Sequence, residues 1–190
     1  LGSAALRPVW LATVIFATLA TLVMTFATVT AQSRGLEQPA TYWLAYASGA
    51  VCVRLLGARM LDRIGPSNLV TPALAACIAG VFLLIEANDL TTLRLAGLVG
   101  GMGHGLCFPV LASQVASRSP DSCRGSALSM FTAIWDLCFL TAPPLLGELA
   151  DQLGDSAMFA ATVAGAIVLL ALWTPLEHRA GRGQDRERLR

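Results

Sequence analysis

Charge is scarce in this chain. Only 13% of the 190 residues are charged, lysine is absent, and all thirteen basic residues are arginines. The chain is 55% hydrophobic, which is more apolar surface than a soluble domain of this length needs. Its five cysteines form no C-x-x-C pair, and no phosphate loop, zinc helix motif or carboxylate dyad is present. We therefore expect a membrane protein without a metal or a cofactor, and not an enzyme.

In contrast to charged residues, long apolar segments are abundant in the sequence. They approach the roughly 20 residues that a membrane-spanning helix needs, and none alternates as a barrel strand does. We predict an all-α integral membrane protein with six transmembrane helices, near residues 8–30, 41–58, 69–87, 93–116, 125–147 and 157–174. These helices form one bundle over residues 1–175, and residues 176–190 form a basic tail.

The arginines are unevenly divided between the two sides of the membrane that six crossings define. All but Arg34 and Arg94 fall on the side of the two termini. Because an excess of arginine marks the cytoplasmic side, we expect both termini in the cytoplasm. The basic tail also contains acidic residues and has no aromatic residue to stack on bases, so we expect it to contact anionic lipid and not nucleic acid.

A short charged motif occurs twice in this apolar chain. "RLLGARMLDRIG" ends at Gly65, and "LGELADQLG" ends at Gly154, with Asp62 and Asp151 at the same spacing from the glycine. The first copy falls between the second and third predicted helices, and the second between the fifth and sixth, on the opposite side of the membrane. Because three helices make an odd number of crossings, this pattern predicts two inverted three-helix repeats, about 1–90 and 91–175. The alternative to a repeat is that so short a motif recurs by chance.

These two motifs resemble the signature G-x-L-a-D-r-x-G of the major facilitator superfamily. "RGSALSMFTAIWDLCFLTAPPLLGELAD" also resembles the eleventh helix, and "GGMGHGLCFPVL" the tenth helix, of its bacterial efflux-type members. The resemblance implies the carboxy-terminal six-helix half of a secondary transporter, either a fragment or a separated half. Such a protein moves a small solute by alternating access in the bacterial inner membrane, as efflux or uptake, with a proton as the coupling ion.

The resemblance also implies partners for the half. They are a small-molecule substrate, membrane lipid, and the missing amino-terminal six-helix half or a second copy. One alternative is a half that binds or scaffolds a partner without transporting anything. A less favoured one is an intramembrane hydrolase, for which "YASGA" supplies Ser48 and His104 is the only membrane histidine.

A gate is the role that the resemblance implies for the charged turn. In the family such an aspartate holds the cytoplasmic side shut against a helix of the opposite bundle. The candidate gating and motif residues are Arg54, Asp62, Arg63, Gly65, Arg118 and Arg124, with Gly147, Asp151 and Gly154 from the outer copy. The alternative is a topology anchor with a tight turn, in which Gly65 allows the reversal and Asp62 accepts backbone N–H groups.

A few polar residues lie inside the predicted membrane segments. Asp136, about halfway along the fifth helix, costs about 2.5–3.5 kcal/mol there, so it faces protein or a water-filled cavity. His104 titrates near neutral pH when it is unperturbed. Both residues are candidates for carrying a proton or binding substrate, and both could instead be structural, as a hydrogen-bonded aspartate and a packed histidine.

Two helix surfaces complete the candidates. Thr18, Thr21 and Thr25 form one polar stripe on the first helix, which lines the cavity in the family, although their hydroxyls could instead bond to carbonyls of their own helix. Gly97 and Gly101, with Gly105 at the same spacing, predict the close approach of another helix.

Overall fold

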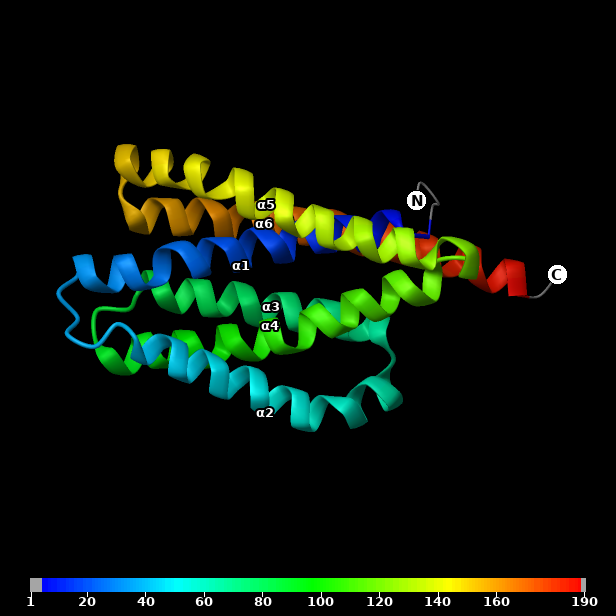
Figure 1. Ribbon diagram of the computed structural model, residues 1–190, viewed down its shortest axis with the longest axis horizontal. Helices are drawn as coiled ribbons and strands as arrows, with labels where there is room; N and C mark the ends of the chain where they lie inside the picture. Colours follow the sequence, from blue (N-terminus) through cyan, green and yellow to red (C-terminus); the bar gives the residue numbers. More distant parts are fainter. Residues whose placement is uncertain (1–4, 189–190) are drawn as a thin grey trace.

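The computed structural model describes residues 5–188, and their side chains except at 57–63 and 182–188. Within that range the chain is helical throughout and has no strand (Figure 1). The helices are α1 (Arg7–Ser33), α2 (Thr41–Ile64), α3 (Pro66–Ile85), α4 (Leu90–Arg118), α5 (Arg124–Leu153) and α6 (Asp155–Arg188), with a 3-10 turn, η1 (Asp121–Cys123), before α5. The all-α class is therefore confirmed.

The helices are longer than most of the apolar segments that predicted them. α2 continues to Ile64, and α6 continues through residues that we expected in the tail, so the boundary between bundle and tail stays a prediction. Five helices are long and apolar enough to cross a membrane; α2, judged on its described residues, is not among them. Its side chains are described only at residues 41–56 and at Ile64, a stretch shorter than a membrane span. α2 nevertheless runs along the bundle beside α4 (Figure 1).

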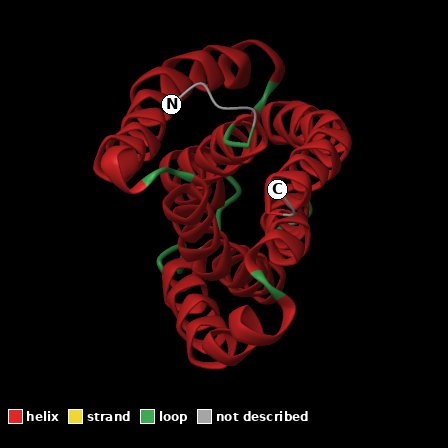
Figure 2. Cartoon of the chain, turned by 90° about the vertical axis from the view of Figure 1, so that its right-hand side faces the viewer, coloured by secondary structure: helices red, strands yellow, loops and turns green. Residues whose placement is uncertain are grey.

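The main helix contacts correspond when the two three-helix units are exchanged. α4 packs on α2 and α3, just as α1 packs on α5 and α6, and α3 also contacts α6. Seen along the bundle, the helices are joined by short loops only (Figure 2), and the N- and C-terminal ends lie at the same end of the bundle (Figure 1). This packing is what two inverted three-helix repeats produce.

The glycines that end the two copies of the charged motif adopt the same backbone conformation. Gly65 alone links α2 to α3, with φ 80° and ψ 148°, and Gly154 alone links α5 to α6, with φ 86° and ψ 159°. This region of φ and ψ is essentially restricted to glycine. The two turns lie at opposite ends of the bundle (Figure 1). The matching geometry supports a true repeat over a chance recurrence of letters.

α4 lies against both of its neighbours at backbone distance. A Cβ atom built on Gly101 would come within 2.0 Å of the Tyr46 carbonyl oxygen of α2, and one on Gly103 within 2.5 Å of the Cys77 backbone nitrogen of α3. The helix begins at Asp89, whose carboxylate accepts hydrogen bonds from the backbone N–H groups of Thr91 and Thr92 and from the Thr92 hydroxyl. The hydrogen bonds from Thr92 lower the pKa of Asp89.

Candidate functional site

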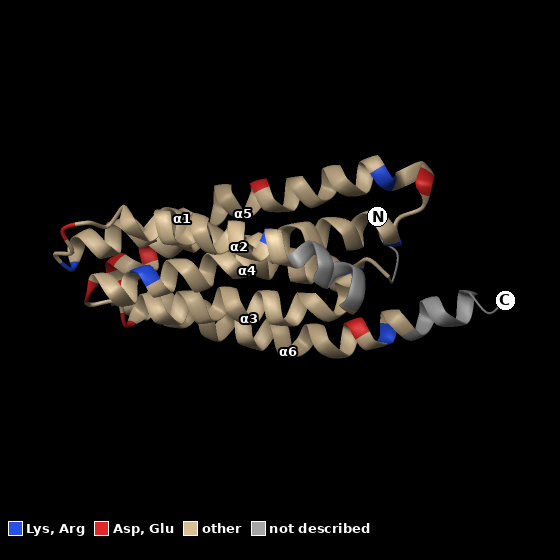
Figure 3. Cartoon of the chain, turned by 90° about the horizontal axis from the view of Figure 1, so that it is seen from below, with Lys and Arg blue, Asp and Glu red and all other residues tan. Residues whose placement is uncertain are grey.

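The described charged side chains gather toward the two ends of the bundle. Figure 3 shows two exceptions, a basic position on α2 and an acidic position on α5, both far from the ends. The acidic position is Asp136, the thirteenth of the 30 residues of α5. The basic position is Arg54, whose Nε donates to the carbonyl of Gly105 in the middle of α4, at 3.4 Å.

Asp136 is exposed on the surface of the six-helix bundle. Among the described residues it has no hydrogen-bond or ion-pair partner, and Ser129 and Thr132, which share its face of the helix, are exposed as well. A carboxylate in this position cannot face hydrocarbon without a cost of about 2.5–3.5 kcal/mol. We therefore expect this face of α5 to meet water or a polar part of another protein segment.

His104 lies among aromatic rings from three other helices. Its ring centroid is 5.0 Å from that of Phe16 on α1, 5.7 Å from Tyr46 on α2 and 5.8 Å from Trp135 on α5. Its Nδ1 atom is buried and has no hydrogen-bond partner among the described residues. The imidazole is thus packed at the centre of the bundle with one nitrogen free to bind a proton or a donor.

The aromatic contacts continue from His104 onto the surface of α4 and α5. Phe108 of α4 contacts Phe131 and Trp135 of α5, with ring centroids 5.3 and 5.8 Å apart, and Trp135 stacks on Phe139 at 5.5 Å. We call Phe108, Phe131, Trp135 and Phe139 the aromatic wall. The sequence analysis missed it, although the spacing of Phe131, Trp135 and Phe139 by four residues places them on one helix face.

The three candidate threonines of α1 do not share one environment. Thr18 is half-buried and lines an apolar groove between α1, α5 and α6. Thr21 is fully buried, and its hydroxyl has no partner among the described residues, whereas Thr25 is exposed. Further along α1, Thr28 accepts a hydrogen bond from the indole N–H of Trp43, at 2.8 Å.

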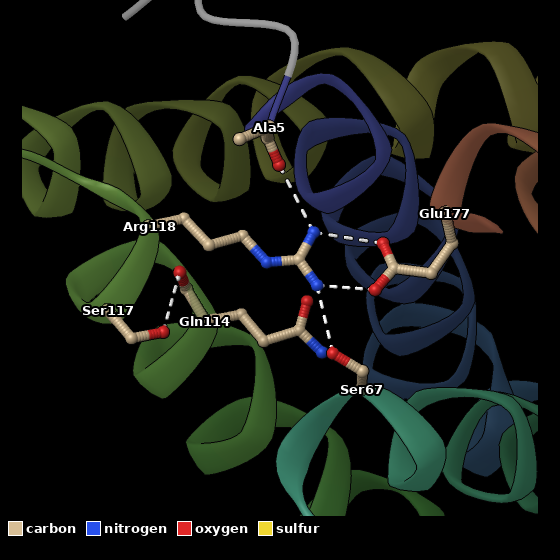
Figure 4. A network of polar contacts seen from close by, with 6 residues as sticks. All are labelled: Ala5, Ser67, Gln114, Ser117, Arg118 and Glu177. Atoms are coloured by element: carbon tan, nitrogen blue, oxygen red, sulfur yellow. Dashed lines mark hydrogen bonds and ion pairs between the residues drawn. The ribbon is translucent and has the colours of Figure 1, made fainter. Parts of the chain in front are cut away.

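Arg118 forms a buried network at the end of the bundle that holds both termini (Figure 4). Its two terminal nitrogens donate to the two carboxylate oxygens of Glu177 on α6, and also to the Ser67 hydroxyl on α3 at 3.0 Å and the Ala5 carbonyl at 3.1 Å. The Arg118 side chain is 8% exposed and that of Glu177 14%. We call these four residues the Arg118 cluster. It ties α4, α3 and α6 together with the segment before α1.

Arg34 forms an equivalent network at the opposite end. It follows α1 as Arg118 ends α4. Its guanidinium donates to the carbonyls of Leu84, in the last turn of α3, and of Ala87, just after α3, at 2.9 and 3.0 Å, and to the Ser156 hydroxyl of α6, at 3.3 Å. Ser156 follows Gly154 by two residues, as Ser67 follows Gly65. We call Arg34 and these three partners the Arg34 cluster. The two clusters are therefore related by the inverted repeat.

The other gating candidate near the connection before α5 is Arg124, which lies apart from the Arg118 cluster. Arg124 pairs with Asp121 in η1 and donates to the carbonyl of Ala116, at 3.1 Å. It is exposed, and the described residues show no hydrogen bond that joins it to Arg118. The structure thus places these two gating candidates in separate sets of contacts, and their role in a gate stays a prediction.

The remaining motif residues are placed as follows. Gly147 lies in α5 with only the Phe26 ring near its potential Cβ position, at 3.9 Å. Asp151 is exposed near the end of α5 and has no hydrogen-bond partner among the described residues. The side chains of Asp62 and Arg63 lie outside the described residues, so the structure leaves their role as a prediction.

Comparisons with known proteins agree with this arrangement. A family model described as Major Facilitator Superfamily matches residues 9–189. An uncharacterized MFS-type transporter of Pseudomonas aeruginosa (strain LESB58) is 28% identical over 160 residues, which cover 84% of this chain and 40% of that protein. The uncharacterized MFS-type transporter YhhS of Escherichia coli (strain K12) is 28% identical over 162 residues, covering 83% and 40%. The chain thus spans about two fifths of the length of these relatives.

Proposed function

Because the chain belongs to the Major Facilitator Superfamily, we propose that it is the carboxy-terminal half of a secondary transporter that moves a small solute by alternating access. The family is one of transporters and not of enzymes, which confirms the expectation that the chain is not an enzyme. The protein is a multi-pass membrane protein, and we place it in the bacterial inner membrane with the Arg118 end in the cytoplasm, as the arginine excess predicts.

The observation that carries the proposal is the exposed carboxylate of Asp136. It lies midway along a membrane-spanning helix and has no partner among the described residues. Because the chain spans about two fifths of its relatives, this face of α5 is the surface that would meet the solute pathway and the amino-terminal half. A charged residue at this depth is typical of a transport pathway, and a scaffold would need a partner that pairs with it.

Proton coupling is assigned to Asp136 and His104. A protonated aspartate is neutral and can pass between states in which its surroundings are wet or dry, whereas the ionised form needs water or a cation beside it. His104 is the other titratable group near this depth with a free nitrogen. In this scheme Asp136 exchanges its proton for the solute, and His104 carries the proton toward it.

We assign the end clusters a role inside the half and not between halves. The partners of Arg118 and Arg34 belong to helices of this same bundle, so the clusters would keep α1, α3, α4 and α6 together as one body while the bundle moves. Closing of the cytoplasmic side is left to the turn that contains Asp62 and Arg63, with Arg54 and Gly65 positioning it.

The test uses the full-length transporter in proteoliposomes that contain a pH-sensitive dye. Small solutes are added in turn under an imposed pH gradient, and the direction of proton movement distinguishes efflux from uptake. We expect Asp136→Asn to abolish solute-induced proton movement and His104→Gln to flatten its pH dependence. Glu148→Gln, a carboxylate substitution near the outer end of α5, is the matched control and should behave as the wild type. Solute transport that ignores the pH gradient would remove proton coupling, and no transport of any solute would favour the scaffold.

A further inference from the structure

We propose that an apolar groove between α1, α5 and α6 binds one acyl chain of a phospholipid, from the membrane leaflet at the Arg34 end of the bundle. This role goes beyond the proposed function, because the ligand is membrane lipid and not the transported solute. The groove has a volume of about 290 Å³, and Leu19 of α1, Leu149 of α5 and Gly165 of α6 are among the residues that line it. That volume is at the low end of the range for ligand pockets.

The lining of the groove offers hydrocarbon and little else. Among the described residues no charged side chain lines it, and its two hydroxyls are already bonded within the protein. The Thr162 hydroxyl donates to the carbonyl of Met158 at 2.9 Å, and the Thr18 hydroxyl pairs with the thiol of Cys138. Because apolar cavities do not hold water, the groove selects an apolar occupant.

The groove runs along the helices over the depth of one leaflet. Its α6 side extends from Ala161 to Leu169, which is about 12 Å at 1.5 Å per residue. Ala161 lies about 9 Å along α6 from the first residue of that helix, Asp155, at the Arg34 end. The hydrocarbon core of a bilayer is about 30 Å thick, so one leaflet contributes about 15 Å. The groove therefore runs toward the midplane from one side of the membrane, as an acyl chain does.

The mouth of the groove is continuous with an exposed, uncharged surface of α6. This helix has no charged residue over 156–176, and only 28% of its most apolar stretch is buried in the bundle. Gly165 is exposed, and Val168 and Leu172, which lie on the same side of the helix, are 60% and 55% exposed. On a membrane-spanning helix such a surface contacts lipid chains. The chains that cover α6 are thus next to the groove and have the chemistry that it accepts.

The groove lies on a different side of α5 from Asp136. Leu146 and Leu149, which line it, share a side of the helix with the buried ring of Phe131. Asp136 is exposed on another side. The groove is therefore separate from the polar face that we assign to the solute, and its occupant comes from the membrane.

The experiment fills the groove from within. A Cβ atom built on Gly165 would meet no atom within 4 Å, so Gly165→Leu places a side chain in the groove without a clash at Cβ, and Gly165→Ala fills it in part. Gly125→Leu is the matched control, because Gly125 has equally open surroundings at the start of α5, outside the groove. Thermal unfolding in detergent should show that no variant is less stable than the wild type.

The readout is photolabelling of the full-length transporter in proteoliposomes of phosphatidylethanolamine and phosphatidylglycerol. A trace of the phosphatidylethanolamine carries a diazirine in the distal half of one acyl chain. Leu19 lines the groove and is only 1% exposed, so lipid that stays on the outer surface of the bundle does not reach it. We expect label on Leu19 in the wild type and in Gly125→Leu, loss of most of it in Gly165→Leu, and a smaller loss in Gly165→Ala.

Two results would overturn the inference. One is label on Leu19 that is absent from the wild type or equal in all variants. The other is displacement of the label by a solute that drives proton movement, which would assign the groove to the solute. Both leave the proposed function standing, because that function is tested by proton movement. Absence of transport together with the expected labelling would instead reject the proposed function and keep the lipid site.

Discussion

Helix α2 of the first repeat lies against α4 of the second, and its counterpart α5 of the second repeat lies against α1 of the first. The first pair meets at backbone distance, because glycines of α4 face the carbonyls of Tyr42 and Tyr46. The second pair has no such contact at Gly147, and α5 has only Ala127 and Phe131 fully buried. Equivalent helices therefore pack differently, since α2 is fixed to α4 and α5 keeps most of its surface uncovered by the bundle.

The largest effect is expected at the two arginine clusters. Arg118→Met leaves the buried carboxylate of Glu177 without its partner and should lower the free energy of unfolding by about 3–5 kcal/mol. Arg34→Met leaves only carbonyls and a hydroxyl, which should cost about 1–3 kcal/mol. Thermal unfolding of the purified transporter in detergent measures both. The double variant Arg118→Met with Glu177→Met should recover most of the stability, and equal losses at the two arginines would mean that Glu177 is not the cause of the difference.

The helix interfaces should give the next largest contrast. Gly101→Ala places a methyl group 2.0 Å from the Tyr46 carbonyl oxygen, so α2 and α4 must separate, at a cost of about 3 kcal/mol. In Gly147→Ala the new methyl group lies 3.9 Å from the Phe26 ring, which is ordinary contact. The higher helix propensity of alanine should then raise the free energy of unfolding by about 1 kcal/mol. The same unfolding assay should therefore show opposite signs. A loss of stability at Gly147 would show that α5 packs as closely as α2.

The smallest contrast is expected at the two turns. Gly65→Ala and Gly154→Ala each force alanine into a backbone conformation with φ near +80°, at a cost of about 1–3 kcal/mol, and neither methyl group would meet an atom within 4 Å. Because their backbones match, the two losses should be equal within error. A much larger loss of transport than of stability at Gly65 alone would assign that turn to the gate.

Local patterns in the sequence predicted much of the fold. The length of the apolar segments predicted six helices, and the repeated charged motif predicted the two glycine turns and the inverted repeat. The spacing of Gly97, Gly101 and Gly105 correctly predicted a close helix contact. These features depend on residues within a turn or two of one another, so hydropathy and spacing were enough to find them.

The candidate site was less accessible from the sequence. Glu177 lies 59 residues from Arg118, and no pattern in the tail marks it as a partner. Arg124, another gating candidate, pairs locally with Asp121, three residues away, and the gating pattern in the sequence did not indicate this pair. Thr18, Thr21 and Thr25 share a stripe on α1, yet their exposure depends on which neighbouring helix covers each one.

The sequence alone is thus sufficient to predict an all-α membrane bundle with an inverted repeat. The prediction rests on hydropathy, the arginine distribution and the two charged motifs that end in glycine, whose effects depend on neighbouring residues and on the surrounding membrane. The tertiary structure alone decides that rings from three other helices converge on His104, that Arg118 meets Glu177, and that Asp136 remains uncovered. Those contacts depend on the rotation and depth of each helix against its neighbours, which are set by side-chain packing between distant segments.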